Sequence, residues 1–230
     1  MTDLIDTTEM YLRTILELEE EGIVPLRARI SERLHHSGPT VSQTVGRMER
    51  DGLVNITDDR RLVLTEEGRH KAINVMRKHR LAERLLADVI GLEWEYVHDE
   101  ACRWEHVMSE RVERKLLTIL DHPTESPYGN PIPGLEDLGA VRVGSYQTRV
   151  VGVVELLIDL GEPATARIKR LAEPAQVDPE LLGQFAAAGV LPGNTASFTR
   201  QGDLVHVEVE GSSEAIDLPV EVAAHIFVSL

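Results

Sequence analysis

Apolar side chains recur at helical spacing through the N-terminal part of the chain. The pattern predicts three helices, from Asp3 to Glu20, from Arg27 to Leu34 and from Pro39 to Asp51. A glycine follows the first and the third of them, which is a typical stop signal. Ser37 stands where it can cap the third helix, with Pro39 in the first turn.

The pattern then changes to two short β-type runs, Leu53–Thr57 and Arg61–Thr65, around a polar turn at 58–60. Runs of this kind on either side of a polar turn predict a β-hairpin. Helix, tight turn, helix and hairpin follow one another in the order of a winged helix-turn-helix. We therefore predict such a domain over residues 1–73.

Three more helices are predicted before the character of the chain changes. Thr65 caps a long one from Glu66 to about Ile90, another begins near Glu93, and Ser109 caps a third that reaches Ile119. The stretch Ser126–Gly134 is dense in proline and glycine and predicts a loop near a domain boundary. A helical domain over 74–140 and a linker over 141–149 follow from this division.

The C-terminal part, 150–230, reads as short strands separated by glycine, proline and aspartate. The predicted strands are Val150–Leu157, Ala164–Ile168, Ala196–Thr199, Leu204–Val209 and Ala215–Leu218. Short strands of this kind suggest a small β-barrel. The fold class is thus mainly α with a small β-domain.

Composition narrows the class of protein. The chain has 230 residues with 42% hydrophobic and 27% charged side chains, values ordinary for a globular protein. It has no apolar run long enough to span a membrane, and its acidic, amphipathic start does not resemble a signal peptide. One cysteine cannot form an internal disulfide, which fits a reducing cytoplasm, so we expect a cytoplasmic protein.

The charge pattern is compatible with nucleic-acid binding despite a net charge of −15. The segment 26–50 holds five arginines against two glutamates, so a local basic face survives. In a winged helix-turn-helix the second helix of the motif enters the major groove. The alternative is that this shape serves as a protein-interaction module and that the arginines solvate helix faces. The residues expected at base edges are Ser37, Pro39, Thr40, Ser42 and Gln43, and those expected at phosphates are Arg27, Arg47, Arg50 and Arg60.

The second candidate site is a stripe of metal-ligating residue types. His98, Cys102, Glu105 and His106 step by four, three and one, which is one stripe of a helix. An earlier pair, His79 and Glu83, has the same one-turn spacing. This mixture of nitrogen, oxygen and sulfur suits iron, cobalt, nickel or zinc rather than calcium or magnesium. Six candidate ligands exceed one tetrahedral site, so two sites are expected.

Each element of the stripe has a more ordinary interpretation. A His/Glu pair on a helix is usually a salt bridge, and a lone cysteine is usually a small core residue. A metalloenzyme would need an open coordination position and a general base, and no His-Glu-x-x-His motif is present. A metal sensor and, less favoured, a metalloenzyme both remain open on these residues.

Several motifs resemble one family. They are Asp6-Thr-Thr-Glu-Met-Tyr-Leu-Arg, Ser37-Gly-Pro-Thr-Val-Ser-Gln, Arg77-Lys-His-Arg-Leu-Ala-Glu, His98-Asp-Glu-Ala-Cys-Arg-Trp-Glu-His and Asn130-Pro-Ile-Pro-Gly. They resemble the diphtheria toxin repressor family, in particular its iron-dependent regulator branch. The resemblance is continuous to about Gly139 and weak beyond it. It implies an Fe(II)-activated homodimer that binds palindromic operators, with one or two dimers on each, and controls iron-uptake, siderophore and iron-storage genes.

The resemblance also implies roles for individual residues. The primary metal site would contain Met10, Cys102, Glu105 and His106. The ancillary site would contain His79, Glu83 and His98, completed from an SH3-like C-terminal domain by Glu173 and Gln176, which have the family's spacing. Thr7 would lie near a DNA phosphate. Co(II), Ni(II), Mn(II) or Zn(II) would substitute for Fe(II) in vitro, in line with the Irving–Williams order.

A manganese-responsive regulator of the same superfamily is the nearer alternative. Such regulators are expected to lack the C-terminal β-domain and to carry a harder carboxylate in place of Cys102, so the sequence favours iron. The chain also departs from the family pattern, because the linker from Ala140 to Thr148 is shorter and lacks a proline-rich stretch. His35 and His36 stand where relatives carry acidic and amide residues.

Overall fold

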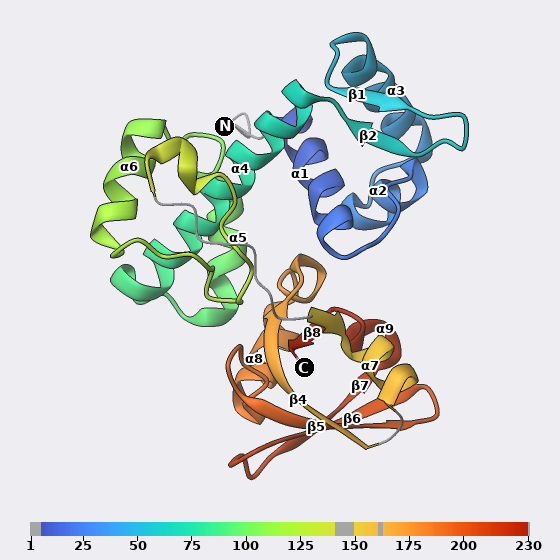
Figure 1. Cartoon of the computed structure of the whole chain (residues 1–230), viewed down its shortest axis with the longest axis vertical. Helices are drawn as coiled ribbons and strands as arrows, with labels where there is room; N and C mark the ends of the chain where they lie inside the picture. The colour runs from blue at the N-terminus through green and yellow to red at the C-terminus, as the bar shows by residue number, and fades with distance from the viewer. Residues whose placement is uncertain (1–5, 141–149, 161–162, 230) are drawn as a thin grey trace.

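The computed structural model describes residues 6–140, 150–160 and 163–229. It has three parts: an N-terminal domain, a helical domain and a C-terminal β-domain, joined as Figure 1 shows. The predicted linker at 141–149 lies outside the described residues. No helix in the described ranges is long and apolar enough to cross a membrane.

The N-terminal domain has the winged helix-turn-helix order that the sequence predicts. Its elements are α1 (Thr7–Glu20), α2 (Arg27–Leu34), α3 (Gly38–Arg50), β1 (Val54–Ile56) and β2 (Leu62–Leu64). The first helix begins at Thr7 rather than at Asp3, because Asp6 is extended and its carboxylate accepts the backbone N–H groups of Thr8 and Glu9. Ser37 caps α3 as predicted, accepting the N–H of Thr40.

A long helix connects the N-terminal and helical domains (Figure 1). Helix α4 (Glu66–Leu85) is capped by Thr65 and continues as the π-helical turn η1 (Leu86–Ile90) until Gly91, which has a φ of 74°. Ala72 and Met76 in its first half are part of the core of the N-terminal domain. Leu81 and Ala82 in its second half are part of the core that the helical and C-terminal domains share. Because one rigid helix belongs to both cores, movement at one end is transmitted to the other.

Three further elements complete the helical domain: α5 (Trp94–Trp104), α6 (Glu110–Ile119) and η2 (Leu135–Leu138). Helix α5 ends at Trp104, with Glu105 as its C-cap. The predicted stripe is therefore helical only through Cys102, and Glu105 and His106 lie in the turn that follows.

The C-terminal domain is an SH3-like, six-stranded antiparallel sheet in the order β3-β8-β4-β5-β6-β7. The strands are β3 (Val150–Gly152), β4 (Ala164–Leu171), β5 (Thr195–Gln201), β6 (Leu204–Val209), β7 (Ala215–Pro219) and β8 (Ile226–Ser229). The helical pieces are α7 (Val153–Leu160), η3 (Glu173–Ala175), α8 (Pro179–Ala188) and α9 (Val220–Ala223).

One predicted strand in this domain is wrong. The run Val150–Leu157 is a strand only to Gly152 and then becomes helix α7. The β-branched residues suggested a strand, but Val153, Leu156 and Leu157 are buried at helical spacing, and this packing overrides the local preference. The sequence analysis also did not identify α8 or β8.

The C-terminal domain docks on the loop that was predicted at 126–134. Backbone N–H of Leu171 donates to the carbonyl of Tyr128 at 2.9 Å, and the side chain of Asn130 donates to the carbonyl of Leu171 at 2.7 Å. Between them Gly129 has a φ of 80°, and a Cβ placed there would lie 2.1 Å from the carbonyl oxygen of Lys169. Only glycine allows this close approach.

We expect Gly129→Ala to destabilise the protein by at least about 1–2 kcal/mol, since a left-handed residue with a Cβ is strained and the new methyl group meets the β4 backbone. Thermal unfolding should show a melting temperature lower by roughly 4 °C or more. The matched control is Gly183→Ala in α8, where a Cβ would meet nothing within 4 Å. Equal melting temperatures for the two variants would contradict this account of docking.

Candidate metal centre

Helices α4 and α5 bring four ligand-type side chains together in the helical domain. His79 and Glu83 are one turn apart on α4, and His98 and Cys102 are one turn apart on α5. Tyr128 fixes the start of α5: its hydroxyl donates to the carbonyl of Trp94 at 2.7 Å and accepts the backbone N–H of His98 at 3.2 Å. The docking loop thus positions one of the ligand-type residues.

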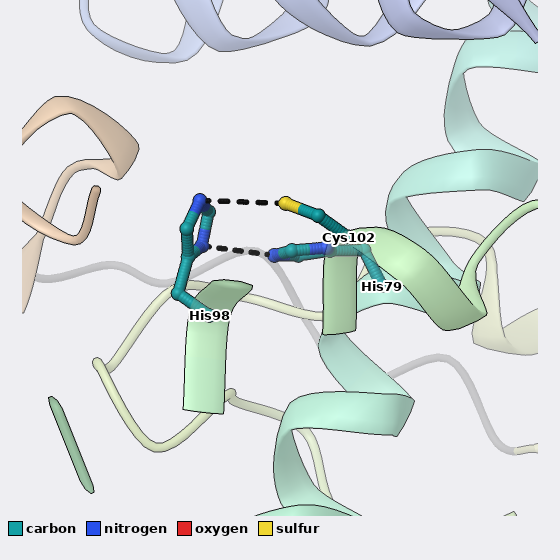
Figure 2. Close-up of side chains that lie close together, drawn as sticks. All are labelled: His79, His98 and Cys102. Carbon is teal, nitrogen blue, oxygen red and sulfur yellow. Dashed lines mark hydrogen bonds between the residues drawn. The ribbon is translucent and has the colours of Figure 1, made fainter. Parts of the chain in front are cut away.

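Figure 2 shows His79, His98 and Cys102 facing one another from the two helices. One nitrogen from each histidine and the Cys102 sulfur lie within 4.8 Å of each other. His98 Nε2 is 3.6 Å from Cys102 Sγ, and His98 Nδ1 is 3.2 Å from His79 Nε2. These distances are short enough for the three side chains to bind one cation together.

Two carboxylates flank His79. Its Nε2 is 2.8 Å from Glu83 Oε1, and its Nδ1 is 2.7 Å from Glu105 Oε2. His79 is 0% exposed, and both glutamates are 1% exposed. Buried charges at this depth are stable only with compensating partners. The cluster is therefore a buried polar network whose carboxylates need positively charged partners.

The electrostatics of the cluster follow from this burial. Burial disfavours the protonated form of His79, but the Glu83 carboxylate outweighs it and holds the His79 pKa well above its ordinary value. Burial would raise the pKa of Glu105, yet Arg13 and His79 lower it to about 2. The Cys102 thiol behaves similarly: burial opposes ionisation, while His98, Arg13 and His79 bring the pKa well below that of an ordinary thiol.

Arg13, which the sequence analysis missed, supplies positive charge from α1. Its Nη1 lies 2.5 Å from Glu105 Oε2, 3.2 Å from His79 Nδ1 and 3.5 Å from Cys102 Sγ. The available signal was its position three residues after Met10, on the same side of a helix. Glu9, one residue before Met10, was missed as well: its Oε2 lies 2.7 Å from His106 Nδ1.

Of the remaining residues predicted for the primary site, the structure brings His106 to the edge of the cluster but does not bring Met10 into contact with it. His106 is close to Glu105, with 3.3 Å between Nε2 and Oε1. Met10 is half-buried against the N-terminal core. The ligand sets predicted as two sites therefore interleave here, since Cys102 contacts His98 and Glu105 contacts His79.

Glu173 of η3 reaches the helical domain, whereas Gln176, the residue after η3, bonds within its own domain. Glu173 Oε1 accepts from Arg80 Nη2 at 2.7 Å, and this arginine lowers the Glu173 pKa to about 2 although burial alone would raise it. Gln176 donates through Nε2 to the carbonyl of Leu171 at 2.7 Å. Its Oε1 is buried and accepts no hydrogen bond from the described residues. A buried acceptor without a donor fits a ligand for a cation.

The donor set as a whole fits a divalent metal of intermediate softness. It offers imidazole nitrogens, carboxylate oxygens, one thiolate and the amide oxygen of Gln176, all on rigid elements. An arginine already occupies part of the cluster, which shows that the site accepts positive charge.

The residues predicted to contact DNA lie on one domain. On α3 the side chains of Pro39, Thr40, Ser42, Gln43, Arg47 and Arg50 are exposed, while Val41, Thr44, Val45 and Met48 are buried. Ser37 is exposed and its Oγ lies 2.8 Å from Thr40 Oγ1. Arg60 is exposed in the hairpin turn with a φ of 66°, whereas Arg27 and Thr7 are half-buried.

Three family models match successive parts of the chain. They are the iron-dependent repressor N-terminal DNA-binding domain over 3–62, the iron-dependent repressor metal-binding and dimerisation domain over 65–134, and the FeoA domain over 156–230. The chain therefore belongs to the iron-dependent repressor family. This membership places it among metal-dependent transcriptional repressors rather than enzymes.

Individual relatives align over nearly the whole chain. The iron-dependent repressor IdeR of Mycobacterium tuberculosis (strain ATCC 25618 / H37Rv) is 56% identical over 97% of this chain and 96% of its own length. The diphtheria toxin repressor of Corynebacterium glutamicum is 58% identical over 94% of each chain. The similarity thus extends well beyond Gly139, where the recognisable motifs become weak.

Solved structures share the fold. The structure described as T. acidophilum IdeR matches with a TM-score of 0.75 and 29% identity over 98% of both chains. A manganese-dependent transcriptional repressor in complex with manganese matches with a TM-score of 0.80 and 26% identity, over 97% of this chain and all of its own. A C-terminal β-domain therefore does not separate iron from manganese regulators, and that argument from the sequence is wrong.

The depressed Cys102 pKa gives a pH prediction for the metal-free protein. Since the pKa lies below its ordinary value, the thiolate should persist as pH falls below about 8.5. The ultraviolet thiolate absorbance, taken as the difference from Cys102→Ser, measures it directly because the chain has one cysteine. His98→Gln should move the midpoint upward. A thiolate that forms only above about pH 8.5 would contradict the electrostatic description.

Proposed function

We propose that this chain is an Fe(II)-activated repressor that binds palindromic operators as a homodimer. The observation that carries the proposal is the buried cluster itself, which joins a helix of the DNA-binding domain to two helices of the helical domain. Such a cluster can couple a bound cation to the position of α1.

We assign the ligands as the family resemblance implies. Met10, Cys102, Glu105 and His106 form the primary site, and His79, Glu83, His98, Glu173 and Gln176 form the ancillary one. The donor chemistry supports this, as does the unfilled acceptor of Gln176. In the structure Arg80 pairs with Glu173 and Arg13 pairs with Glu105, so two of the carboxylates already have a cationic partner.

The thiolate of Cys102 supports iron rather than manganese, because Mn(II) favours carboxylate and water ligands. The names of the relatives agree with this assignment. Co(II), Ni(II), Mn(II) and Zn(II) are expected to substitute in vitro, since ligand type alone does not exclude them.

Met10, Cys102, Glu105 and His106 would hold a divalent cation, which would supply bonds among side chains of different helices. Met10 would then keep the start of α1 close to Cys102 and His106, and α1 would carry the rest of the DNA-binding domain with it. Changing a population from 1:99 to 99:1 needs about 5.5 kcal/mol of differential binding, which is within the range of metal coordination. We infer that Gln43 contacts adenine and that Arg47, Arg50 and Arg60 contact phosphates, and the exposure of these side chains supports this.

The function is tested by anaerobic gel shifts with a palindromic operator duplex under Fe(II), Mn(II) or chelator. We expect a shift that requires metal and is stronger with Fe(II). Cys102→Ala and Met10→Ala should each abolish the metal-dependent shift while circular dichroism shows a folded protein. A variant that kept wild-type metal dependence would show that its residue is not a ligand.

Arg47→Ala is the matched control on the DNA side. It should weaken binding at every metal concentration and reduce the salt dependence by about one phosphate contact, leaving metal affinity unchanged. No shift under any metal with the wild-type protein would refute the proposed function.

The dimer surface is proposed on the helical domain. Among the described residues, six exposed large apolar side chains lie there: Val89, Ile90, Tyr96, Val107, Val112 and Ile119. Exposed apolar side chains gathered on one domain are typical of an interface. The family model over 65–134 is a dimerisation domain, which agrees.

Ile90→Glu should therefore weaken the dimer, because a carboxylate would be buried without a partner. Sedimentation velocity across a concentration series should show a dissociation constant at least about tenfold higher. Ile158→Glu is the control, since Ile158 is 74% exposed on α7 of the C-terminal domain. If both variants remained as dimeric as the wild type, the interface would lie elsewhere.

A further inference from the structure

Arg13 lies among the candidate metal ligands. Its guanidinium lies inside the cluster, with Nη1 within 3.5 Å of acceptors on Glu105, His79 and Cys102. All three are candidate metal ligands. The arginine side chain is only 12% exposed, so these contacts are formed largely out of water. A guanidinium and a divalent cation would therefore compete for the same electron pairs.

Charge balance explains why an arginine is there. Glu83 and Glu105 are both buried, and Cys102 beside them is half-buried. Buried carboxylates without a cation nearby are strongly destabilising. Arg13 brings positive charge from α1 into contact with Glu105 and Cys102 and so compensates their negative charge.

The structure also places another carboxylate and a cavity beside the Arg13 guanidinium. Arg13 Nε already lies 2.8 Å from Glu17 Oε1, one turn further along α1. Both residues line a cavity of roughly 440 Å³ between α1, α2 and η3, which Arg29, Glu32 and Arg33 also line. Glu17 is 6% exposed and lies 3.9 Å from Arg33, so a second arginine shares this acceptor, and Glu32 pairs with Arg29 at 2.9 Å. Glu17 is therefore the carboxylate outside the ligand cluster that the Arg13 guanidinium already contacts.

We propose that Arg13 is a built-in counter-cation that occupies the ligand cluster in the metal-free protein and withdraws into this cavity when a divalent metal binds. The inference rests on the proposed function. Arg13 acts on metal binding by competition: its contacts stabilise the metal-free state, and its charge would repel a metal if it stayed. It therefore sets the metal concentration at which the repressor becomes active.

The test compares Arg13→Leu with the wild type in titrations of metal-free protein with Ni(II) and Co(II), using a competing chelator. Leucine is apolar, removes the charge and the hydrogen bonds of the arginine, and offers no ligand atom of its own. A hydrogen bond to a charged group has a net free energy that corresponds to a tenfold or larger change in affinity. We therefore expect Ni(II) to bind Arg13→Leu at least about tenfold more tightly than it binds the wild type.

Arg33→Leu is the matched control. Arg33 is 14% exposed, lines the same cavity and pairs with Glu21 at 2.8 Å and Glu17 at 3.9 Å, but it has no contact with the ligand cluster among the described residues. The metal affinity of this variant should stay within about twofold of wild type. A second readout is thermal unfolding without metal, where Arg13→Leu should be less stable than the wild type and should gain more from added Ni(II).

Arg13→Lys is the second variant, for use if the leucine variant does not fold. The shorter ammonium cannot reach all three acceptors, so the metal affinity of Arg13→Lys should exceed that of the wild type, but by less than the affinity of the leucine variant does. Unchanged or weaker Ni(II) binding by folded Arg13 variants, with normal binding by the wild type, would overturn this inference alone. Failure of the wild type to bind any of the metals would instead overturn the proposed function.

Discussion

The structure depends on how two buried carboxylates, Glu83 and Glu105, are compensated on either side of His79. Each is almost fully removed from water, so each needs a positive partner at hydrogen-bond distance. Helices α4 and α5 supply part of this charge through their histidines, and α1 supplies the rest through Arg13. The buried carboxylates thus require positive charge at the point where three helices meet. A metal bound there would change the positions of these helices relative to one another.

The C-terminal domain is connected to the same network. Arg80 on α4 holds Glu20 at the end of α1 with its Nη1 at 3.0 Å from Oε1, and holds Glu173 of the C-terminal domain at 2.7 Å. Arg170 donates to the Glu20 carbonyl at 2.8 Å, and His225 lies 3.0 Å from Glu21. The end of α1 is therefore fixed by both other domains, while its start lies near His106. A change at the cluster can move α1 only by acting against these contacts.

Spacing along single helices was predictable from the sequence, because residues one turn apart share a face. The pairs His79/Glu83 and His98/Cys102, the order of the winged domain and the cap at Ser37 all follow from such local rules. Contacts between distant segments were not predictable in this way. Arg13 and Glu105 are ninety-two positions apart in the sequence. They come into contact only because α1 packs against the helical domain. Helix α7 was mistaken for a strand because its β-branched residues outweighed their helical spacing.

The central claim is that this buried cluster is a cation site in which Cys102 takes part. Its most direct test is the absorption spectrum of the metal-free protein during titration with Co(II), because a thiolate bound to cobalt gives an intense charge-transfer band. The account predicts a band that grows with added Co(II), saturates at a defined ratio and is absent from Cys102→Ser. Saturable Co(II) binding without the band would contradict the role of Cys102, and no saturable binding would contradict the claim as a whole.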